Sequence, residues 1–259
     1  MDTLPPHQPL LKQVIRFSNG NRAQAVIFPI DANVTDIVHT LSLPQPGALI
    51  MIAGGASQMT KNTGAELSPL VTDGIAHIAA SLHALIIDGG TQAGVMALIG
   101  LGVAHQRHRP TLLGVAPASI VMYPGKSPNK THSKAVSLDP NHSHFVLVEA
   151  DEWGGETETM YELARVFSQR SPSLALLING GGIAKSEVLH NVRQRRPIII
   201  IEGSGRLADE LTNIVHHKAT SPSEPELSEI IADGDLHLFP PTGTIADFEQ
   251  LAQRLLRKQ

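Results

Sequence analysis

Short apolar runs alternate with longer amphipathic stretches along most of the chain. Runs such as LALLI at 174–178 and IIII at 198–201 contain no polar residue, so both faces of these strands must be covered. The pattern therefore predicts an α/β fold with a doubly wound, mostly parallel sheet between helices. We expect its strands at 48–53, 84–87, 111–116, 145–149, 174–178 and 197–201, and its helices at about 65–82, 92–106, 155–169, 184–194 and 205–217.

The two ends of the chain follow a different pattern. Residues 13–17 and 24–28 are short apolar segments on either side of SNGN, which favours an N-terminal β-hairpin. Two polar stretches also interrupt the rhythm, and we interpret 117–144 as an irregular excursion and 217–235 as a surface connection. We expect a single domain over 1–259, made of a hairpin region at 1–46, a core at 47–217 and a C-terminal extension at 218–259.

Composition and charge narrow the function classes. The 259 residues carry 20 Lys and Arg against 24 Asp and Glu, so no global positive field is available to hold a nucleic-acid backbone. The chain has no cysteine, which excludes thiol chemistry and fits a reducing compartment. Its longest apolar stretch, 93–104, is too short to span a bilayer. We expect a cytoplasmic protein with no nucleic-acid partner and no direct membrane insertion.

Four of the predicted strands end in glycine-rich turns: IMIAGGAS at 50–57, DGGTQAGVM at 88–96, LLINGGGIAKSEV at 176–188 and IIIIEGSGRLADEL at 198–211. In doubly wound sheets ligands bind at the carboxyl ends of the strands, near the point where the strand order reverses. Glycine lets backbone N–H groups approach an oxyanion, and the following helix adds the positive end of its dipole. We therefore predict a phosphate-binding rim and expect contacts from Gly54, Gly55, Ala56, Ser57, Asp88, Gly89, Gly90, Thr91, Gly94, Val95, Met96, Asn179, Gly180, Gly181, Gly182, Gly203, Ser204, Gly205 and Arg206.

Charged residues near this rim are further candidates. Glu149 and Asp151, with Glu152 beside them, close the predicted strand FVLVEADEW, where carboxylates can accept hydrogen bonds from ribose hydroxyls; helix initiation is the alternative interpretation. Among the cations, Arg206 and Lys61 are the candidates for a diphosphate. The lysines of the 117–144 excursion, Lys126, Lys130 and Lys134, fit a solvated loop equally well.

The histidines and the single tryptophan give no cofactor signature. His142 and His144 stand on alternate positions of NHSH, but no third ligand follows nearby, so we reject a zinc site and expect neither a metal nor a cofactor. Trp153 either stacks on a base or covers the sheet. The motifs G-x-G-x-x-G and G-x-x-x-x-G-K-[ST] are absent, which argues against an ordinary NAD dehydrogenase and a P-loop NTPase.

Together with NHSHFVLVEADEWGGETE at 141–158, the glycine-rich turns resemble the SLOG superfamily, and within it the branch named for the N-terminal cytosolic domain of melastatin-type TRP channels. The resemblance runs from about Ala48 to Val215. It implies a Rossmann-like domain that senses or processes a nucleotide-derived small molecule such as ADP-ribose or a cyclic relative. A sensor of this kind acts as a homo-oligomer or through a separate effector protein.

A different branch, the lonely-guy phosphoribohydrolases, cleaves nucleotide N-glycosidic bonds through P-G-G-x-G-T-x-x-E. The sequence NGGGIAKSE keeps the glutamate as Glu187, but has Asn179, Ile183 and Ala184 in place of proline, glycine and threonine. The resemblance therefore makes Glu187 the catalytic residue only if the protein is a hydrolase, and a ligand contact otherwise. Glu187 near the start of a helix also has a purely structural interpretation. We expect a binding protein rather than an enzyme, with a structural oligomerisation domain as the third hypothesis.

Overall fold

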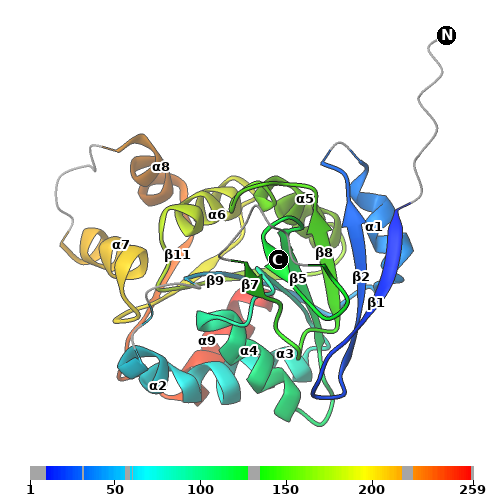
Figure 1. The fold of residues 1–259 in the computed structure, drawn as a ribbon. Helices are drawn as coiled ribbons and strands as arrows, with labels where there is room; N and C mark the ends of the chain where they lie inside the picture. Colours follow the sequence, from blue (N-terminus) through cyan, green and yellow to red (C-terminus); the bar gives the residue numbers. More distant parts are fainter. Residues whose placement is uncertain are drawn as a thin grey trace.

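The structure is a computed structural model, and it describes residues 10–30, 32–55, 59, 61–127, 135–217 and 224–257. A nine-stranded sheet runs through the molecule in the order β1-β2-β8-β5-β4-β3-β9-β10-β11 (Figure 1). Its strands are β1 (Leu11–Arg16), β2 (Arg22–Phe28), β3 (Leu49–Gly54), β4 (Leu85–Asp88), β5 (Thr111–Pro117), β8 (His144–Val148), β9 (Ser173–Ile178), β10 (Ile198–Ile201) and β11 (Leu236–Phe239).

All neighbouring strands of this sheet are parallel except β1 and β2, which pair as an antiparallel hairpin. The predicted Rossmann-like, mostly parallel sheet with an N-terminal hairpin is thereby confirmed. From β3 the chain moves through β4 and β5 to β8, then returns to place β9 on the other side of β3. The strand order therefore reverses between β3 and β9. The ends of β4, β3, β9 and β10 lie on one rim, as the glycine pattern requires.

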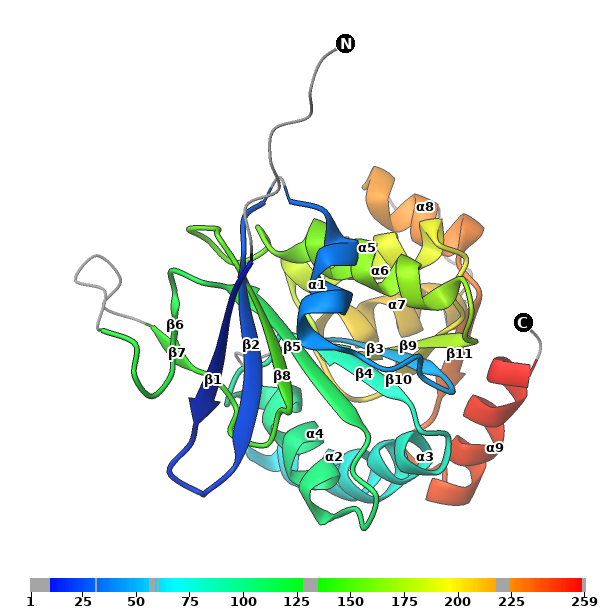
Figure 2. The same ribbon diagram turned by 90° about the vertical axis from the view of Figure 1, so that its right-hand side faces the viewer.

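Helices cover both faces of the sheet, and Figure 2 shows the two layers. The core on one face includes residues of α1 (Val34–Leu41), α5 (Thr157–Ser168), α6 (Gly182–Arg193), α7 (Arg206–His217) and α8 (Pro225–Asp233). The other face is packed by α4 (Gly94–His105), α9 (Ile245–Arg257) and a long helical segment composed of α2 (Lys61–Pro69), the π-helical turn η1 (Leu70–Ile75) and α3 (Ala76–Ser81). Because both layers are apolar on the inside, the central strands carry no polar alternation.

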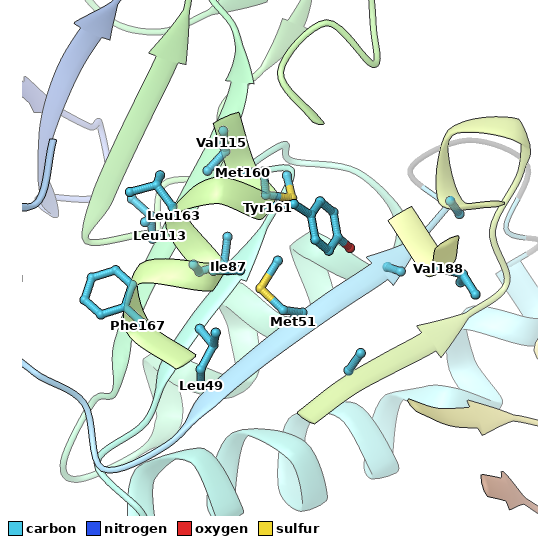
Figure 3. Packing of buried hydrophobic residues seen from close by; sticks show 14 of the residues in the cluster. Leu49, Met51, Ile87, Leu113, Val115, Met160, Tyr161, Leu163, Phe167 and Val188 are labelled. Atoms are coloured by element: carbon cyan, nitrogen blue, oxygen red, sulfur yellow. The ribbon is translucent and has the colours of Figure 1, made fainter. Parts of the chain in front are cut away.

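The core beneath α5 shows how the strands and helices fit together (Figure 3). Leu49 and Met51 of β3 and Ile87 of β4 are each at most 2% exposed and belong to the same cluster as Phe167 and Tyr161 of α5. The Tyr161 hydroxyl lies toward α6, where it accepts a hydrogen bond from Asn191 Nδ2 at 2.9 Å. The polar end of this buried ring is therefore satisfied, and α5 and α6 are fixed relative to each other.

One sequence interpretation is wrong in part. The stretch 217–235 is a surface connection by its composition, but Pro225–Asp233 forms helix α8. Leu227 and Ile230, three residues apart, are both buried where α8 packs on α6 and α7, and Pro225 stands in the first helical turn, where its missing N–H costs nothing. A few apolar residues at helical spacing are therefore enough to form a packed helix here, although most residues around them are polar.

The remaining parts of the chain extend the layers. The strand β11 continues the parallel sheet beyond β10, and α9 packs on it through the edge-to-face pair Phe239 and Phe248, with ring centroids 5.5 Å apart. Within the described residues, no helix combines the length and apolar character needed to cross a membrane.

Candidate functional site

A cavity of about 430 Å³ lies at the carboxyl ends of β3 and β9, where the strand order reverses. This is the position at which doubly wound sheets hold their ligands. Residues from both sides of the reversal line it. Eight of them belong to the predicted rim, namely Gly54, Gly55, Gly89, Thr91, Met96, Gly181, Gly182 and Arg206, and the separately predicted Glu187 lines it too. The glycine-rich ends of three strands therefore meet around one space.

A positively charged group and a helix start form one side of the cavity. Gly181 precedes α6, whose first-turn N–H groups have no partner within the helix. The Arg206 guanidinium lies directly against Gly181, because a β-carbon at that position would sit 2.5 Å from Nη2. Glycine at 181 is thus what allows Arg206 to approach. The two groups together suit an anion such as a phosphate.

A second, smaller cavity of about 300 Å³ adjoins this side and shares Gly181, Gly182 and Arg206 with the first. Its lining also includes Lys185 of α6, which forms ion pairs with Glu224 and Glu226 at the start of α8. Arg206 is therefore common to two spaces.

Two buried carboxyl groups lie on the lining of the main cavity. Glu187 is 8% exposed and Glu156 is 4% exposed. Burial raises the pKa of Glu187 well above its ordinary value, and the charges of Glu156 and Asp88 raise it further. Burial also raises the pKa of Glu156, although the Gly154 N–H, 2.7 Å from Oε2, opposes this shift. Burial and the neighbouring charges therefore both favour the protonated form of Glu187, which can donate a hydrogen bond.

Asp88, predicted as a ligand contact, lies beneath the cavity wall. It is fully buried, and its Oδ1 accepts a hydrogen bond from the Gly90 N–H at 2.7 Å and lies 2.8 Å from His142 Nε2. The other ring nitrogen, Nδ1, lies 3.1 Å from Asp139 Oδ1. Burial lowers the pKa of His142, but the two carboxylates outweigh this effect and raise the pKa to about 9. His142 is thus an imidazolium between two carboxylates.

The same cluster attaches part of the 117–144 excursion to the rim. The Asp139 N–H donates to the Gly90 carbonyl at 2.9 Å, and the Gln92 N–H donates to the Ser137 carbonyl at 2.8 Å. An isolated bridge joins Thr91 to Leu138, and Val136 reaches the cavity lining. The excursion contains the short paired strands β6 (Val121–Met122) and β7 (Val136–Ser137). Its returning half therefore forms a wall of the cavity.

Several predicted residues lie away from the lining. Seven of them support the surrounding turns: Asp88, Gly90, Gly94, Val95, Asn179, Gly180 and Ser204. Gly203 and Gly205 lie in the turn before α7. Glu149 and Asp151 are exposed beyond the end of β8. The Asn179 N–H, for example, donates a hydrogen bond to Ser204 Oγ at 2.8 Å, and the Asn179 carbonyl accepts one from the Ala208 N–H at 3.0 Å. Ala56, Ser57, Lys130, Lys134 and the side chain of Lys61 lie outside the described residues.

Sequence reasoning missed most of the opposite side of the cavity. Ile52, Ala93, Val136 and Glu156 line it, and so do Ile183 and Ala184, the two residues that depart from the hydrolase motif. Trp153 and Ile183 are 38% and 40% exposed, and Ile183 Cγ1 would lie 3.8 Å from a β-carbon at Gly154. These exposed apolar side chains mark the mouth. The signal that the sequence offered is a large apolar residue directly beside a glycine, as Trp153 is beside Gly154 and Ile183 beside Gly182.

Among the described residues, no group of three or more His, Asp or Glu side chains is arranged to hold a metal ion. His142 and His144, the pair considered in the sequence, lie in different surroundings. His142 is bound between two aspartates, whereas His144 Nδ1 lies 2.9 Å from the Ser143 hydroxyl. Burial and the charge of Lys12 lower the pKa of His144 to about 4, so it is neutral at pH 7.

The chain matches one family of known proteins over most of its length. The family model described as SLOG in TRPM, prokaryote matches residues 47–244, and the chain belongs to this family. The resemblance to the SLOG superfamily is thereby confirmed. The match begins just before β3 and ends just before α9, so it contains every lining residue of the cavity.

Curated relatives are ion channels, of which this chain resembles a small part. It is 26% identical over 212 residues to Transient receptor potential cation channel subfamily M member 2 of Mus musculus, covering 66% of this chain and 14% of the channel. It is 26% identical over 243 residues to member 7 of Homo sapiens, covering 80% of this chain and 13% of the channel. A third match, 26% over 281 residues, is to the channel trpm of Drosophila melanogaster, with 94% and 14% covered.

Proposed function

We propose that this protein binds a nucleotide-derived ligand, such as ADP-ribose or a cyclic relative, in the cavity between β3 and β9. The observation that carries the proposal is the approach of the Arg206 guanidinium to Gly181 at the start of α6. This arrangement brings a permanent cation and unpaired backbone N–H groups to the lining of a cavity at the strand-order reversal. Such a site favours a phosphate group.

The rest of the cavity supports a nucleotide rather than a free phosphate. Trp153 and Ile183 give the mouth an apolar surface on which a base can stack. The cavity of about 430 Å³ is within the size range of small-molecule sites, and much larger than one phosphate requires. A ligand with a planar base at one end and a phosphate at the other matches this distribution of side chains.

The experiment is calorimetric titration with ADP-ribose, cyclic ADP-ribose and AMP. Arg206→Gln removes the cation, and we expect it to weaken binding about tenfold to a hundredfold, the loss typical of a charge-assisted hydrogen bond. Arg170→Gln, at an exposed arginine just after α5, is the matched control and should bind as the wild type does. Equal affinity of wild type and Arg206→Gln would refute the phosphate position, and no binding of any probe would refute the proposal.

The alternative function is hydrolysis of a nucleotide N-glycosidic bond. The two buried carboxyl groups favour it, because burial raises the pKa of Glu187 and so makes it better suited to protonate a departing base. Release of free base from AMP by the wild type, with a loss of about a hundredfold or more in Glu187→Gln, would establish hydrolysis. A sensor would bind and release the nucleotide unchanged, and we favour this outcome because Ile183 and Ala184 replace the glycine and threonine of the hydrolase motif.

As a sensor, the protein must pass the bound state to another molecule. We propose that it does so in the cytoplasm as a homo-oligomer or through a separate effector protein. The relatives named above are cation channels, in which a region similar to this chain is joined to a much longer protein. Light scattering with and without ADP-ribose measures the first possibility directly: a mass that stays at one chain in both conditions would refute the homo-oligomer.

A further inference from the structure

Glu156 lies within the stretch 141–158 that resembles the family, but the sequence pattern assigned it no ligand contact. It stands immediately before the first turn of α5, is 4% exposed and lines the main cavity. Its Oε2 accepts a hydrogen bond from the Gly154 N–H at 2.7 Å, across a turn in which Gly154 has φ of 98°. This turn reverses the chain after the exposed carboxylates 149–152, so Glu156 reaches the cavity while they do not.

Two other polar side chains of the lining have hydrogen-bonding capacity to spare. Thr91 is 1% exposed, and no described residue bonds its hydroxyl. Glu187 is 8% exposed, and no described residue donates a hydrogen bond to its carboxyl group. A buried polar group without a partner is costly, so such groups in a cavity wall point to a ligand that satisfies them. These residues come from three elements: the turn after β4, the start of α5 and α6.

We propose that Glu156, Glu187 and Thr91 bind adjacent hydroxyl groups of a sugar ring, and that Glu156 determines the preference for ribose over deoxyribose. The inference rests on the proposed function and assigns a partner to the uncharged part of the same ligand. Each hydroxyl of a diol is both a donor and an acceptor, so a carboxylate accepts from it while a protonated carboxyl or a threonine hydroxyl donates to it. Two carboxyl groups and a threonine hydroxyl together supply both the acceptors and the donors that a diol requires.

The charges of the cavity favour a diol over the other ligands that carboxylates attract. An organic cation would pair with Glu156, but Arg206 lies on the same lining and repels it. A metal ion would need further ligands, and the described residues supply no group of three around it. A phosphate is repelled by Glu156 and attracted by Arg206. The cavity thus has an anion-binding side at Arg206 and a hydroxyl-binding side at Glu156.

The test is a comparison of ADP-ribose with its analogue lacking the 2′-hydroxyl of the adenosine ribose and with the analogue lacking the 2″-hydroxyl of the terminal ribose. We expect the wild type to bind ADP-ribose at least tenfold more tightly than one of the two analogues, because a site built to bond a hydroxyl rejects a ligand without it. In Glu156→Gln this ratio should fall to threefold or less. In Glu158→Gln, at the exposed glutamate in the first turn of α5, it should stay as in the wild type.

The outcomes separate this inference from the proposed function. Equal binding of all three probes by the wild type overturns the diol assignment and leaves nucleotide binding standing, and it requires no variant that must fold. An unchanged ratio in a folded Glu156→Gln, with binding still lost in Arg206→Gln, overturns the role of Glu156. If the wild type binds none of the probes, both proposals fall together.

Discussion

The buried His142 makes the stability of this protein depend on pH. Its ring is fully buried between Asp88 and Asp139, at 2.8 and 3.1 Å. Burial alone would lower its pKa, but the two carboxylates raise it from 6.5 to about 9. The perturbation we consider is Asp139→Asn, which removes one of the two charges and keeps the shape of the side chain.

The raised pKa of His142 determines both the sign and the size of the change in stability with pH. A group with a higher pKa in the folded than in the unfolded state stabilises the fold fully below the unfolded value. That contribution disappears as the pH rises through the folded value. For His142 the window runs from 6.5 to about 9, and a shift of this size corresponds to roughly 3 kcal/mol at about 1.4 kcal/mol per pKa unit. In Asp139→Asn the remaining charge of Asp88 should hold the pKa at an intermediate value.

Urea unfolding between pH 6 and pH 10 measures this dependence. We expect the wild-type free energy of unfolding to fall by roughly 3 kcal/mol across the window, and the fall in Asp139→Asn to be smaller and to occur at lower pH. His105→Gln, at an exposed histidine in the last turn of α4, should reproduce the wild-type curve. The assignment of an imidazolium to His142 is refuted if wild type and Asp139→Asn lose the same free energy over the same pH range.

Two further predictions concern the rim. Gly90→Ala should destabilise the fold by roughly 2–5 kcal/mol, because φ is 66° and the new methyl group would lie 2.8 Å from Gly114 Cα. Gly125→Ala, with φ of 90° and open space around it, should cost only the roughly 1–2 kcal/mol of the backbone conformation, and equal losses in urea would contradict the packing argument. Glu187→Gln should raise the urea midpoint at pH 8, because the raised pKa of Glu187 makes its ionisation unfavourable in the folded state. The exposed Glu158→Gln should leave the midpoint unchanged, and a lower midpoint in Glu187→Gln would show that the carboxyl group stabilises the fold.

The sheet and its glycine-rich rim follow from local patterns, and these were predictable. An apolar run without alternation requires a strand covered on both faces, and a glycine pair directly after it marks the carboxyl end of that strand. Because parallel strands all end on the same rim, the strand direction was enough to place Gly54, Gly89 and Gly181 on one edge of the sheet. That they meet around one cavity depends also on the strand order, in which β4, β3 and β9 are neighbours.

The contacts behind the rim depend on register, which the sequence does not state. Asp88 and His142 belong to β4 and to the loop before β8, and their side chains meet although β5 lies between these two strands in the sheet. Asp88 therefore resembled a ligand contact in sequence, next to the double glycine, while its carboxylate is engaged beneath the turn. Glu156 was missed for the opposite reason: the turn at Gly154 returns it to the cavity, and strand-end counting places 149–152 there instead.

The substitutions in the hydrolase motif acquire a physical meaning in this geometry. Ala184 is 3% exposed and packs so closely beneath Gly180 that a β-carbon there would lie 2.8 Å from the Ala184 methyl group. The hydroxyl that a threonine supplies in the related motif is missing from a closely packed position. Ile183 extends an apolar surface to the mouth, beside Trp153, where glycine would leave space. The threonine hydroxyl that is absent at Ala184 could position a reacting water, and Ile183 adds apolar surface on which we propose that a base stacks. The carboxyl group of Glu187 stays in place. The two substitutions thus remove part of a hydrolytic apparatus without removing the proposed binding contacts, which is why we place binding before turnover.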